Sequence, residues 1–345
     1  MGARIVSERK AAASRGAKRG VQAALAVLLL AAATCNAQAS WPSRPVRVIV
    51  PIAAGGVTDV IVRHAAQALA ARIGQPLVVD NRTGANGMIG AEACARAAPD
   101  GQTLCVLNTG VISVNPVVYE RHPFDPARAF IPVVNLYTLT GAVVVPAASP
   151  FRTVQDLRAA AVGRTRALNF GTIGPGSYPD MFLGWLNAYW NSEIVGVPYA
   201  GGGPVAIALL AGEAHVSAAA LGNFIGQIKG GQLRALAVSG SSRSRLVPDV
   251  PTYGESGLGD FRGHLWWGLF APAGLERALV SRLNREFGTL FREPAFVTFL
   301  ESQAAEPSVG TQEAFAQFVR ADAEWTAGLL RSLRAARGAG PAERR

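Results

Sequence analysis

Strand-like and helix-like segments alternate along most of this chain of 345 residues, and this alternation restricts the fold more than any other feature. A β-type run covers residues 46–50, a helical pattern follows at 58–73, and a second β-type run covers 77–79. The alternation continues beyond residue 142, for example with a helical pattern at 154–161. Such alternation is typical of βαβ units. With half of the residues hydrophobic, the sequence predicts an α/β fold of two lobes, each a mostly parallel sheet flanked by helices.

A glycine-rich turn joins the first predicted strand to the first predicted helix. It reads Pro51-Ile52-Ala53-Ala54-Gly55-Gly56-Val57-Thr58-Asp59. Backbone N–H groups at a helix start have no intrahelical partner and attract anions. The chain has no Gly-Lys dipeptide and the spacing is not Gly-x-Gly-x-x-Gly, so a nucleotide is disfavoured. The turn predicts a site for a small organic anion, with the candidate contacts Ala53, Gly55, Gly56, Thr58 and Asp59.

A second loop, residues 169–177, repeats this arrangement of strand end, glycines and hydroxyl groups before a helix. Thr172 and Ser177 can donate hydrogen bonds to a carboxylate, while Gly174 and Gly176 let the backbone approach a ligand closely. A single loop of this kind is more often an ordinary turn. Two of them, one per lobe and each after a strand, indicate a ligand cleft.

Three other segments are weaker candidates. Asn108 and Thr109 directly follow a predicted strand and are expected in the cleft wall. Tyr199 precedes a glycine triplet, where its ring either closes over a ligand or only packs. In the polar segment 80–87, Arg82 is interpreted as a surface residue or a partner of Asp80 within a turn.

Sequence signatures of catalysis are missing. The chain contains no Gly-x-Ser-x-Gly, His-Glu-x-x-His or Cys-x-x-Cys motif. Its four histidines lack the spacing of metal ligands and are interpreted as structural: His64, His122, His215 and His264. Asp59 with His215 or His264 is the one candidate pair for acid–base chemistry. We therefore predict no catalytic residue, no metal and no cofactor.

The N-terminal residues resemble an export leader. Basic residues precede the apolar run 21–33, and Ala37-Gln38-Ala39 offers a cleavage site before Ser40. Residues 1–39 are therefore predicted to be a signal peptide of a periplasmic protein, with a lipid anchor on Cys35 as the less favoured alternative. Because this segment holds six basic residues and one acid, removing it lowers the formal charge from +10 to about +5. A dispersed excess of this size does not describe a nucleic-acid-binding surface.

Two cysteines, Cys94 and Cys105, remain after the predicted cleavage. In an oxidising compartment they can form a disulfide. Cys94 falls in a helical pattern and Cys105 in a strand pattern, where small buried thiols are common. The patterns favour two free buried thiols.

Several ordered segments resemble the extracytoplasmic receptors of the tripartite tricarboxylate transporter type, often called Bug receptors. The resemblance runs from about Trp41 to Leu333. It rests on segments that include Trp41-Pro42-Ser43-Arg44-Pro45, the Pro51–Asp59 turn, Asn81-Arg82-Thr83-Gly84-Ala85-Asn86-Gly87, Ala98-Pro99-Asp100-Gly101, Asn169-Phe170-Gly171-Thr172, Val197-Pro198-Tyr199 and Pro248-Asp249-Val250-Pro251-Thr252.

The resemblance implies a monomeric periplasmic solute-binding protein of the type II-like class, with two hinge crossings. Residues 40–141 and 262–345 would form lobe 1, and residues 142–261 would form lobe 2. A small carboxylate would lie between the Ala53–Asp59 loop and the Thr172–Ser177 loop. Inner-membrane transporter subunits would receive it. The alternatives are a receptor for a membrane sensor kinase and, less favoured, an exported carboxylate-acting enzyme.

Three positions depart from the family pattern. Alanine stands at Ala54, where the family usually has proline. Pro179 lies near the place of a usual histidine, and Ala218-Ala219-Ala220 lacks a usual aspartate. Loss of an imidazole and a carboxylate would leave a less polar cleft wall. The hypothesis that follows is a ligand more apolar than a compact dicarboxylate.

Overall fold

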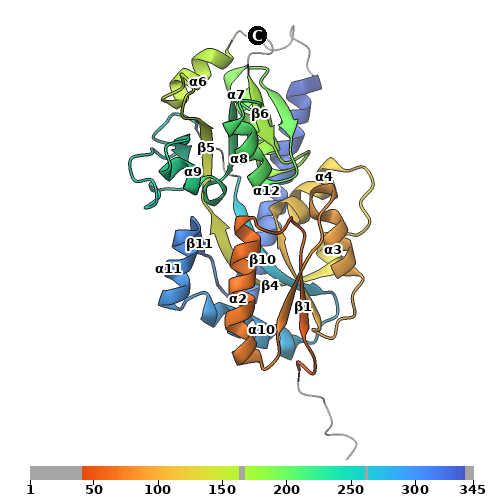
Figure 1. Ribbon diagram of the computed structural model, residues 1–345. Helices are drawn as coiled ribbons and strands as arrows, with labels where there is room; N and C mark the ends of the chain where they lie inside the picture. Colours follow the sequence, from red (N-terminus) through yellow and green to blue (C-terminus); the bar gives the residue numbers. More distant parts are fainter. Residues whose placement is uncertain (1–40, 163–167, 260, 262, 339–345) are drawn as a thin grey trace, which may run out of the picture. The chain divides into compact units, whose positions relative to one another are not determined.

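The computed structural model describes residues 41–162, 168–259, 261 and 263–338, the last five by backbone alone. The predicted leader, with its cleavage site and Cys35, therefore lies outside the described residues. The described residues from Arg44 onward belong to one compact unit, which contains two sheets. Figure 1 shows these sheets with their helices. Among the described residues, no helix combines the length and apolar character that a bilayer-spanning segment needs.

The first sheet has the strand order β11-β4-β10-β3-β1-β2. β1 pairs in parallel with β2 and β3, whereas β10 is antiparallel to β3 and β4, and β11 is antiparallel to β4. Every strand except β10 and β11 therefore runs in the same direction. The strands are β1 (Val46–Val50), β2 (Leu77–Asn81), β3 (Thr103–Asn108), β4 (Phe130–Leu139), β10 (Leu265–Pro272) and β11 (Ala305–Pro307).

The second sheet has the order β7-β6-β8-β5-β9. β6 pairs in parallel with β7 and β8, while β5 is antiparallel to β8 and β9. Both sheets are thus mixed, with most strands in one direction. The strands are β5 (Gly141–Pro146), β6 (Asn169–Thr172), β7 (Val195–Pro198), β8 (Val216–Ala220) and β9 (Leu233–Val238).

Helices follow most of the strands. Those grouped with the first sheet are α2 (Val57–Ile73), α3 (Met88–Ala95), α4 (Asn115–Val118), α5 (Pro126–Ala129), α10 (Arg277–Leu290), α11 (Pro294–Ser302) and α12 (Gln312–Gly338). Those of the second sheet are α6 (Val154–Ala161), α7 (Tyr178–Trp190), α8 (Gly202–Leu210) and α9 (Ile225–Lys229). Short turns of other helix types are η1 (Ala85–Gly87), the π-helical η2 (Gly110–Val114) and η3 (Leu221–Asn223).

Alternation along β5 explains how the second sheet is covered on both faces. Val143 and Val145 pack into a core with Phe182 of α7. Ala142 and Val144 point to the opposite core, which contains Leu209 of α8. Successive strand residues face opposite sides of a sheet, so a short apolar run supplies two cores at once.

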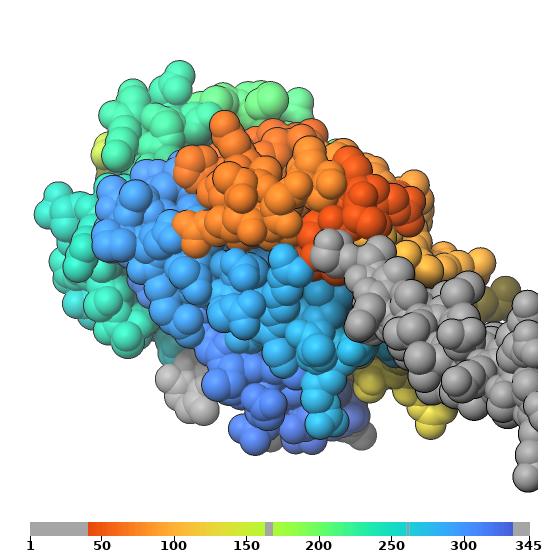
Figure 2. Space-filling view, turned by 90° about the horizontal axis from the view of Figure 1, so that it is seen from below, coloured from red at the N-terminus to blue at the C-terminus, as the bar shows by residue number. Residues whose placement is uncertain are grey.

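The core of the first sheet surrounds Trp266 and Phe270 of β10, which pack against Phe315 of α12. On another face, α10 and α11 lie beside α2, as the blue and orange surfaces in Figure 2 show. His64 of α2 contacts the ring of Phe299, with centroids 4.0 Å apart. The structural interpretation of His64 is confirmed.

The chain passes directly from the first sheet to the second and returns through a longer segment between β9 and β10. β4 and β5 are joined by Thr140 alone, whose N–H donates to the carbonyl of Ala304 at 2.9 Å. The return path reaches β10 after Leu258, a residue of a second-sheet core. The lobe boundaries predicted at 141/142 and 261/262 stay predictions.

A disulfide joins Cys94 of α3 to Cys105 of β3. The prediction of two free thiols is therefore wrong. Their Cα atoms lie 6.3 Å apart, within the range that a disulfide spans. The sequence patterns placed each cysteine in the correct kind of element, but they carry no information on the distance between helix and strand.

Candidate functional site

The loop between β1 and α2 is held in shape by Asp59. Gly55 adopts a left-handed conformation (φ 84°), and its N–H donates to Oδ2 of Asp59 at 2.9 Å. Arg63 Nε donates to both carboxylate oxygens at 3.0 Å, and Asn81 Nδ2 donates to Oδ1 at 2.9 Å. Burial alone would raise the pKa of Asp59, but these hydrogen bonds outweigh it and keep the pKa below its usual value. Asp59 thus organises the loop from beneath it.

The N-terminus of α2 is open. Its N-cap residue is Gly56 in an extended conformation, and no side chain caps the helix. Ala53 and Gly55 are exposed, whereas Thr58 is buried. The first-turn N–H groups of an uncapped helix need an external acceptor. This end of the sheet is suited to an anion.

The loop between β6 and α7 has the same core geometry. Gly176 is also left-handed (φ 77°), and its N–H donates to Oδ2 of Asp180, four residues later, at 2.9 Å. Here, however, Ser177 caps the helix, because its Oγ accepts from the N–H of Asp180. The same hydroxyl donates to the carbonyl of Gly174 at 2.7 Å. The α7 N-terminus is therefore satisfied within its own loop.

Thr172 is likewise engaged within the second sheet. Its Oγ1 donates to the carbonyl of Val197 and accepts from the N–H of Gly174, both at 3.4 Å. Thr172 is 3% exposed. In this structure the Thr172 hydroxyl therefore donates to β7, and the Ser177 hydroxyl donates within its own loop.

A second open helix N-terminus belongs to α8. Gly201 is its N-cap, and no side chain caps it. A Cβ placed on Gly202 would clash with the side-chain amide of Asn223, so this amide lies directly against the first turn of α8. Sequence reasoning noticed the glycine triplet 201–203 but missed Asn223. Only the absence of a side chain at Gly202 hinted at such a close approach.

The turn η3 lies close to both open helix ends. A Cβ placed on Gly222 would lie 3.0 Å from Cγ2 of Val57, the first residue of α2. The neighbouring Asn223 covers Gly202 of α8. The N-termini of α2 and α8, which are grouped with different sheets, therefore both lie next to one three-residue turn.

The remaining predicted residues have other contacts. Tyr199 donates its N–H to the carbonyl of Thr172 at 2.9 Å, and the pKa of its phenol is raised by burial and by the carboxylate of Glu213. Asn108 Oδ1 accepts from the N–H of Val111 at 3.2 Å. Thr109 is 5% exposed and donates to Asp322 of α12 at 2.7 Å. Thr109 thus anchors α12.

The predicted Arg82–Asp80 pair is confirmed, since Arg82 Nε lies 3.0 Å from Asp80 Oδ2. Asp80 belongs to the end of β2, however, and the predicted turn begins only after Asn81. Among the described residues, no group of three or more acidic, histidine or cysteine side chains is placed to hold a metal ion.

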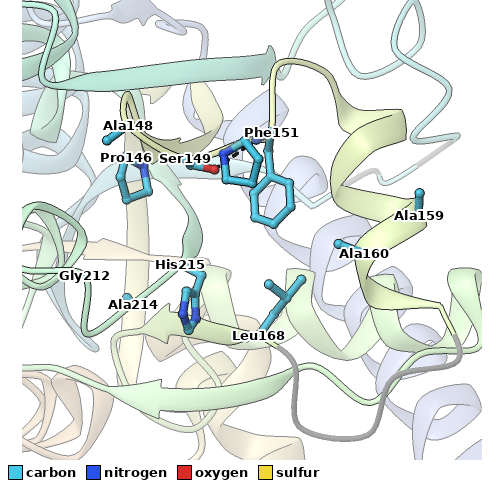
Figure 3. Close-up of a pocket in the computed structure, with 11 residues that line it drawn as sticks. Pro146, Ala148, Ser149, Phe151, Ala159, Ala160, Leu168, Gly212, Ala214 and His215 are labelled. Carbon is cyan, nitrogen blue, oxygen red and sulfur yellow. Dashed lines mark hydrogen bonds between the residues drawn. The ribbon is translucent and has the colours of Figure 1, made fainter.

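A cavity of about 710 Å³ lies elsewhere in the second sheet region. Figure 3 shows Phe151, Leu168 and His215 around it. Nδ1 of His215 accepts from the N–H of Asn169 at 2.8 Å. His215 thus lies at the starting ends of β6 and β8, whereas the glycine loop follows the other end of β6.

Comparisons with known proteins agree with this architecture. The solved structure of R. palustris Rpa4515 with adipate is 29% identical, has a TM-score of 0.81, and matches 85% of this chain and 98% of its own. MatC (Rpa3494) from Rhodopseudomonas palustris with bound malate is 29% identical, with a TM-score of 0.78, and the match covers 84% of this chain and 99% of MatC. These likenesses show the two-lobed α/β fold of periplasmic binding proteins.

Sequence comparison gives the family. The UPF0065 protein in the tcbD-tcbE intergenic region of Pseudomonas sp. (strain P51) is 34% identical over 310 residues, which cover 88% of this chain and 92% of that protein. The model of the "Tripartite tricarboxylate transporter family receptor" matches residues 61–333. The chain therefore belongs to the tripartite tricarboxylate transporter receptor family.

Proposed function

We propose that this protein is a periplasmic receptor that encloses a small carboxylate between two lobes and delivers it to a transporter of the tripartite tricarboxylate type. In this proposal residues 40–141 and 262–345 form lobe 1, residues 142–261 form lobe 2, and the receptor acts as a monomer. Adipate and malate, bound by the two structural neighbours, are both small carboxylates.

The observation that carries the proposal is the pair of uncapped helix N-termini on either side of η3. A helix N-terminus carries a partial positive charge and unpaired N–H donors. α2 supplies one such end, and α8 supplies the other together with the amide of Asn223. A ligand with acceptors at both ends satisfies both helices at once.

Roles for the predicted contact residues follow from this assignment. The N–H groups of the Ala53–Thr58 loop bind one carboxylate, and Asp59 positions that loop without contacting the ligand. On lobe 2 the main polar contact is the Gly201–Gly203 turn with Asn223. The loop from Thr172 to Ser177, including Gly174 and Gly176, forms a wall of the cleft. Asn108, Thr109 and Tyr199 support neighbouring segments.

Closure follows from differential affinity. In an open form the ligand reaches donors of one lobe only, whereas in the closed form it reaches both. The ligand therefore shifts the equilibrium toward the closed form by the free energy of the second set of contacts. Transport subunits, or a sensor kinase in the alternative version, would recognise that closed form.

An enzymatic role has less support. The carboxylate of Asp59 is bonded to Gly55, Arg63 and Asn81, and the Nδ1 atom of His215 is bonded to Asn169. Acid–base catalysis needs a titratable group within hydrogen-bond reach of the reacting atom. Neither of these groups is placed to activate the other.

The three departures from the family pattern bear on ligand polarity. Ala218 and Ala219 pack into the two cores of the second sheet, and Pro179 is buried in α7. The less polar cleft wall that the sequence suggested stays a prediction. The preference for a more apolar ligand stays a hypothesis, which tight binding of a compact dicarboxylate combined with no binding of aromatic or aliphatic acids would contradict.

Thermal unfolding of the purified protein against mono-, di- and tricarboxylates, including adipate and malate, tests the proposal. A ligand at a thousand times its Kd adds about 4 kcal/mol of stability, which raises the Tm by several degrees. The Gly56→Asp variant, whose own side chain would occupy the α2 N-terminus, is the control. A ligand that stabilises both proteins equally would contradict the assigned site.

A further inference from the structure

A strained turn lies between β2 and α3. Four consecutive residues have positive φ angles, namely Gly84 (117°), Ala85 (47°), Asn86 (50°) and Gly87 (85°). Left-handed conformations are unfavourable for residues with a Cβ, and two in a row without glycine are uncommon. Such strain persists only where the surroundings hold it, and it gathers at functional positions.

Asn86 is held by a reciprocal pair of hydrogen bonds with Asn115. Asn86 Nδ2 donates to Oδ1 of Asn115 at 2.8 Å, and Asn115 Nδ2 donates to the carbonyl of Asn86 at 3.1 Å. Asn115 is fully buried. It begins α4, directly after the π-helical turn η2, another irregularity that is frequent at functional sites. Two unusual backbone segments of the first lobe therefore meet at one amide pair.

The second lobe contacts this pair through the left-handed glycine of its own loop. A Cβ placed on Gly176 would lie 3.0 Å from Cγ1 of Val114, 3.3 Å from Nδ2 of Asn86 and 3.7 Å from Oδ1 of Asn115. Gly176 itself is buried. The backbone of one lobe thus rests on the amide pair of the other, with no space for a side chain between them.

An electrostatic interaction also links the two lobes near this loop. The pKa of Tyr119, at the end of α4, is raised by burial and by the carboxylate of Asp180. Asp180 is the residue that holds the N–H of Gly176. Asp180, at the start of α7, therefore lies close enough to Tyr119 of lobe 1 to act on its phenol electrostatically.

We propose that Asn86, Asn115 and Val114 form a closure seat for Gly176, and that this seat sets ligand affinity without contacting the ligand. The inference rests on the proposed receptor function. The apparent Kd of a receptor depends on the fraction of molecules in the binding-competent conformation. Contacts made only between closed lobes change that fraction, so they act chiefly on the rate at which ligand dissociates.

Two glycines of one loop provide a matched test. Gly174 (φ 91°) and Gly176 (φ 77°) are both left-handed, so alanine strains the backbone at both positions. A Cβ on Gly174 meets nothing within 4 Å, whereas a Cβ on Gly176 meets the seat. We expect Gly176→Ala to dissociate from adipate or malate at least fivefold faster than Gly174→Ala, measured by stopped-flow tryptophan fluorescence. Equal rates would overturn the proposal.

Asn86→Gly tests the other side of the seat. Glycine accepts the left-handed conformation, so the turn is retained while the amide is lost. We expect an unchanged unfolding midpoint without ligand and a dissociation rate raised about fivefold. An unchanged dissociation rate would contradict a role for the amide.

A cross-link measures closure without any ligand. In the Val114→Cys/Gly176→Cys variant, replacing Val114 removes the methyl group that a Cβ at position 176 would meet at 3.0 Å, so the two added thiols face each other across the seat. In Val114→Cys/Gly174→Cys the two thiols are farther apart. Mass spectrometry after mild oxidation should show faster cross-linking of the first pair, slowed severalfold by adding Asn86→Gly. Equal rates for the two pairs, or no slowing, would overturn the closure seat. If no carboxylate binds but the cross-linking result holds, the proposed ligand class fails and the seat does not.

Discussion

The two lobes place a similar five-residue loop ahead of a helix, and they use it differently. In Gly55–Asp59 and in Gly176–Asp180, a left-handed glycine donates its N–H to an aspartate four residues later, in both cases at 2.9 Å. The residue after the glycine is Gly56 in one loop and Ser177 in the other. Ser177 caps its helix, whereas Gly56 leaves its helix open. In the proposed function, the Ser177 hydroxyl is therefore what distinguishes the loop that packs between the lobes from the loop that binds an anion.

Asp59 and Asp180 also differ in their burial and in their partners. Asp59 is 3% exposed and bonded to Arg63 and Asn81 as well as to Gly55. Asp180 is half-buried and lies near Tyr119 of the other lobe. The open loop thus has a rigid support beneath it, and the capped loop supports the contact between lobes. Rigid positioning of donors reduces the entropic cost of binding a small ligand.

The largest effect on stability and binding is expected from removing the Asp59 carboxylate, which holds the Gly55–Asp59 loop. Asp59→Ala removes the carboxylate that accepts hydrogen bonds from Arg63, Asn81 and the N–H of Gly55. We expect a loss of about 2–4 kcal/mol in the free energy of unfolding and about a hundredfold weaker carboxylate binding. Asp180→Ala should cost roughly 1 kcal/mol, since it removes one backbone hydrogen bond. Urea unfolding and calorimetric titration measure both, and equal losses for the two variants would refute the contrast between the loops.

The second-largest effect is expected from changing the N-cap residues Gly56 and Ser177. Gly56→Asp should weaken carboxylate binding about 10- to 30-fold, because its side chain competes for the α2 N-terminus, an interaction of up to about 2 kcal/mol. Stability should stay the same or rise, since aspartate is a good N-cap. Ser177→Gly should cost only a few tenths of a kcal/mol in stability and leave the Kd nearly unchanged. Titration calorimetry on both variants separates the open helix end from the capped one.

The α8 contact has a matched pair of its own. Gly202→Ala forces the Asn223 amide away, whereas a Cβ on Gly203 meets nothing within 4 Å. We expect about fivefold weaker binding for Gly202→Ala, equivalent to roughly 1 kcal/mol, and little change for Gly203→Ala. The two Kd values would be equal if α8 did not take part in the site.

Lowering the pH is expected to have the smallest effect, and it acts on stability. The pKa of Asp59 is lowered in the folded protein, so its contribution to stability is present above its unfolded pKa of about 3.9 and is lost as the pH falls through the lower folded value. The urea concentration at the unfolding midpoint should therefore decrease when the pH is lowered below about 4. This drop should be shallower in Asp59→Asn, and identical acid profiles for the two proteins would count against the assigned network.

Local patterns in the sequence predicted much of the fold but less of the site. The helical pattern at 154–161 coincides with α6, and the pattern at 58–73 differs from α2 by one residue. β4 (Phe130–Leu139) was missed, although it pairs with β10 and leads into the second sheet. Its apolar run is interrupted by Pro132 and Asn135, and only its pairing with distant strands makes it a strand.

Local sequence patterns also predicted only part of the candidate site. The sequence identified both glycine loops because glycines and hydroxyls before a helix are local signals. It did not distinguish Ser177 as a cap from Ser177 as a ligand donor, since both uses employ the same hydroxyl. Asn223 was missed because its approach to Gly202 depends on how β8 and α8 pack. The Cys94–Cys105 disulfide depends in the same way on a distance between elements.

Backbone amide NMR during a carboxylate titration can identify which helix N-termini bind the ligand. The protein is labelled with ¹⁵N and titrated with the carboxylate that gives the largest thermal shift. We expect saturable amide shifts at Val57, Thr58 and Gly203, the open ends of α2 and α8, with much smaller shifts at Tyr178 and Asp180 of capped α7. Shifts centred on Thr172–Ser177, with α2 and α8 unmoved, would contradict this expectation.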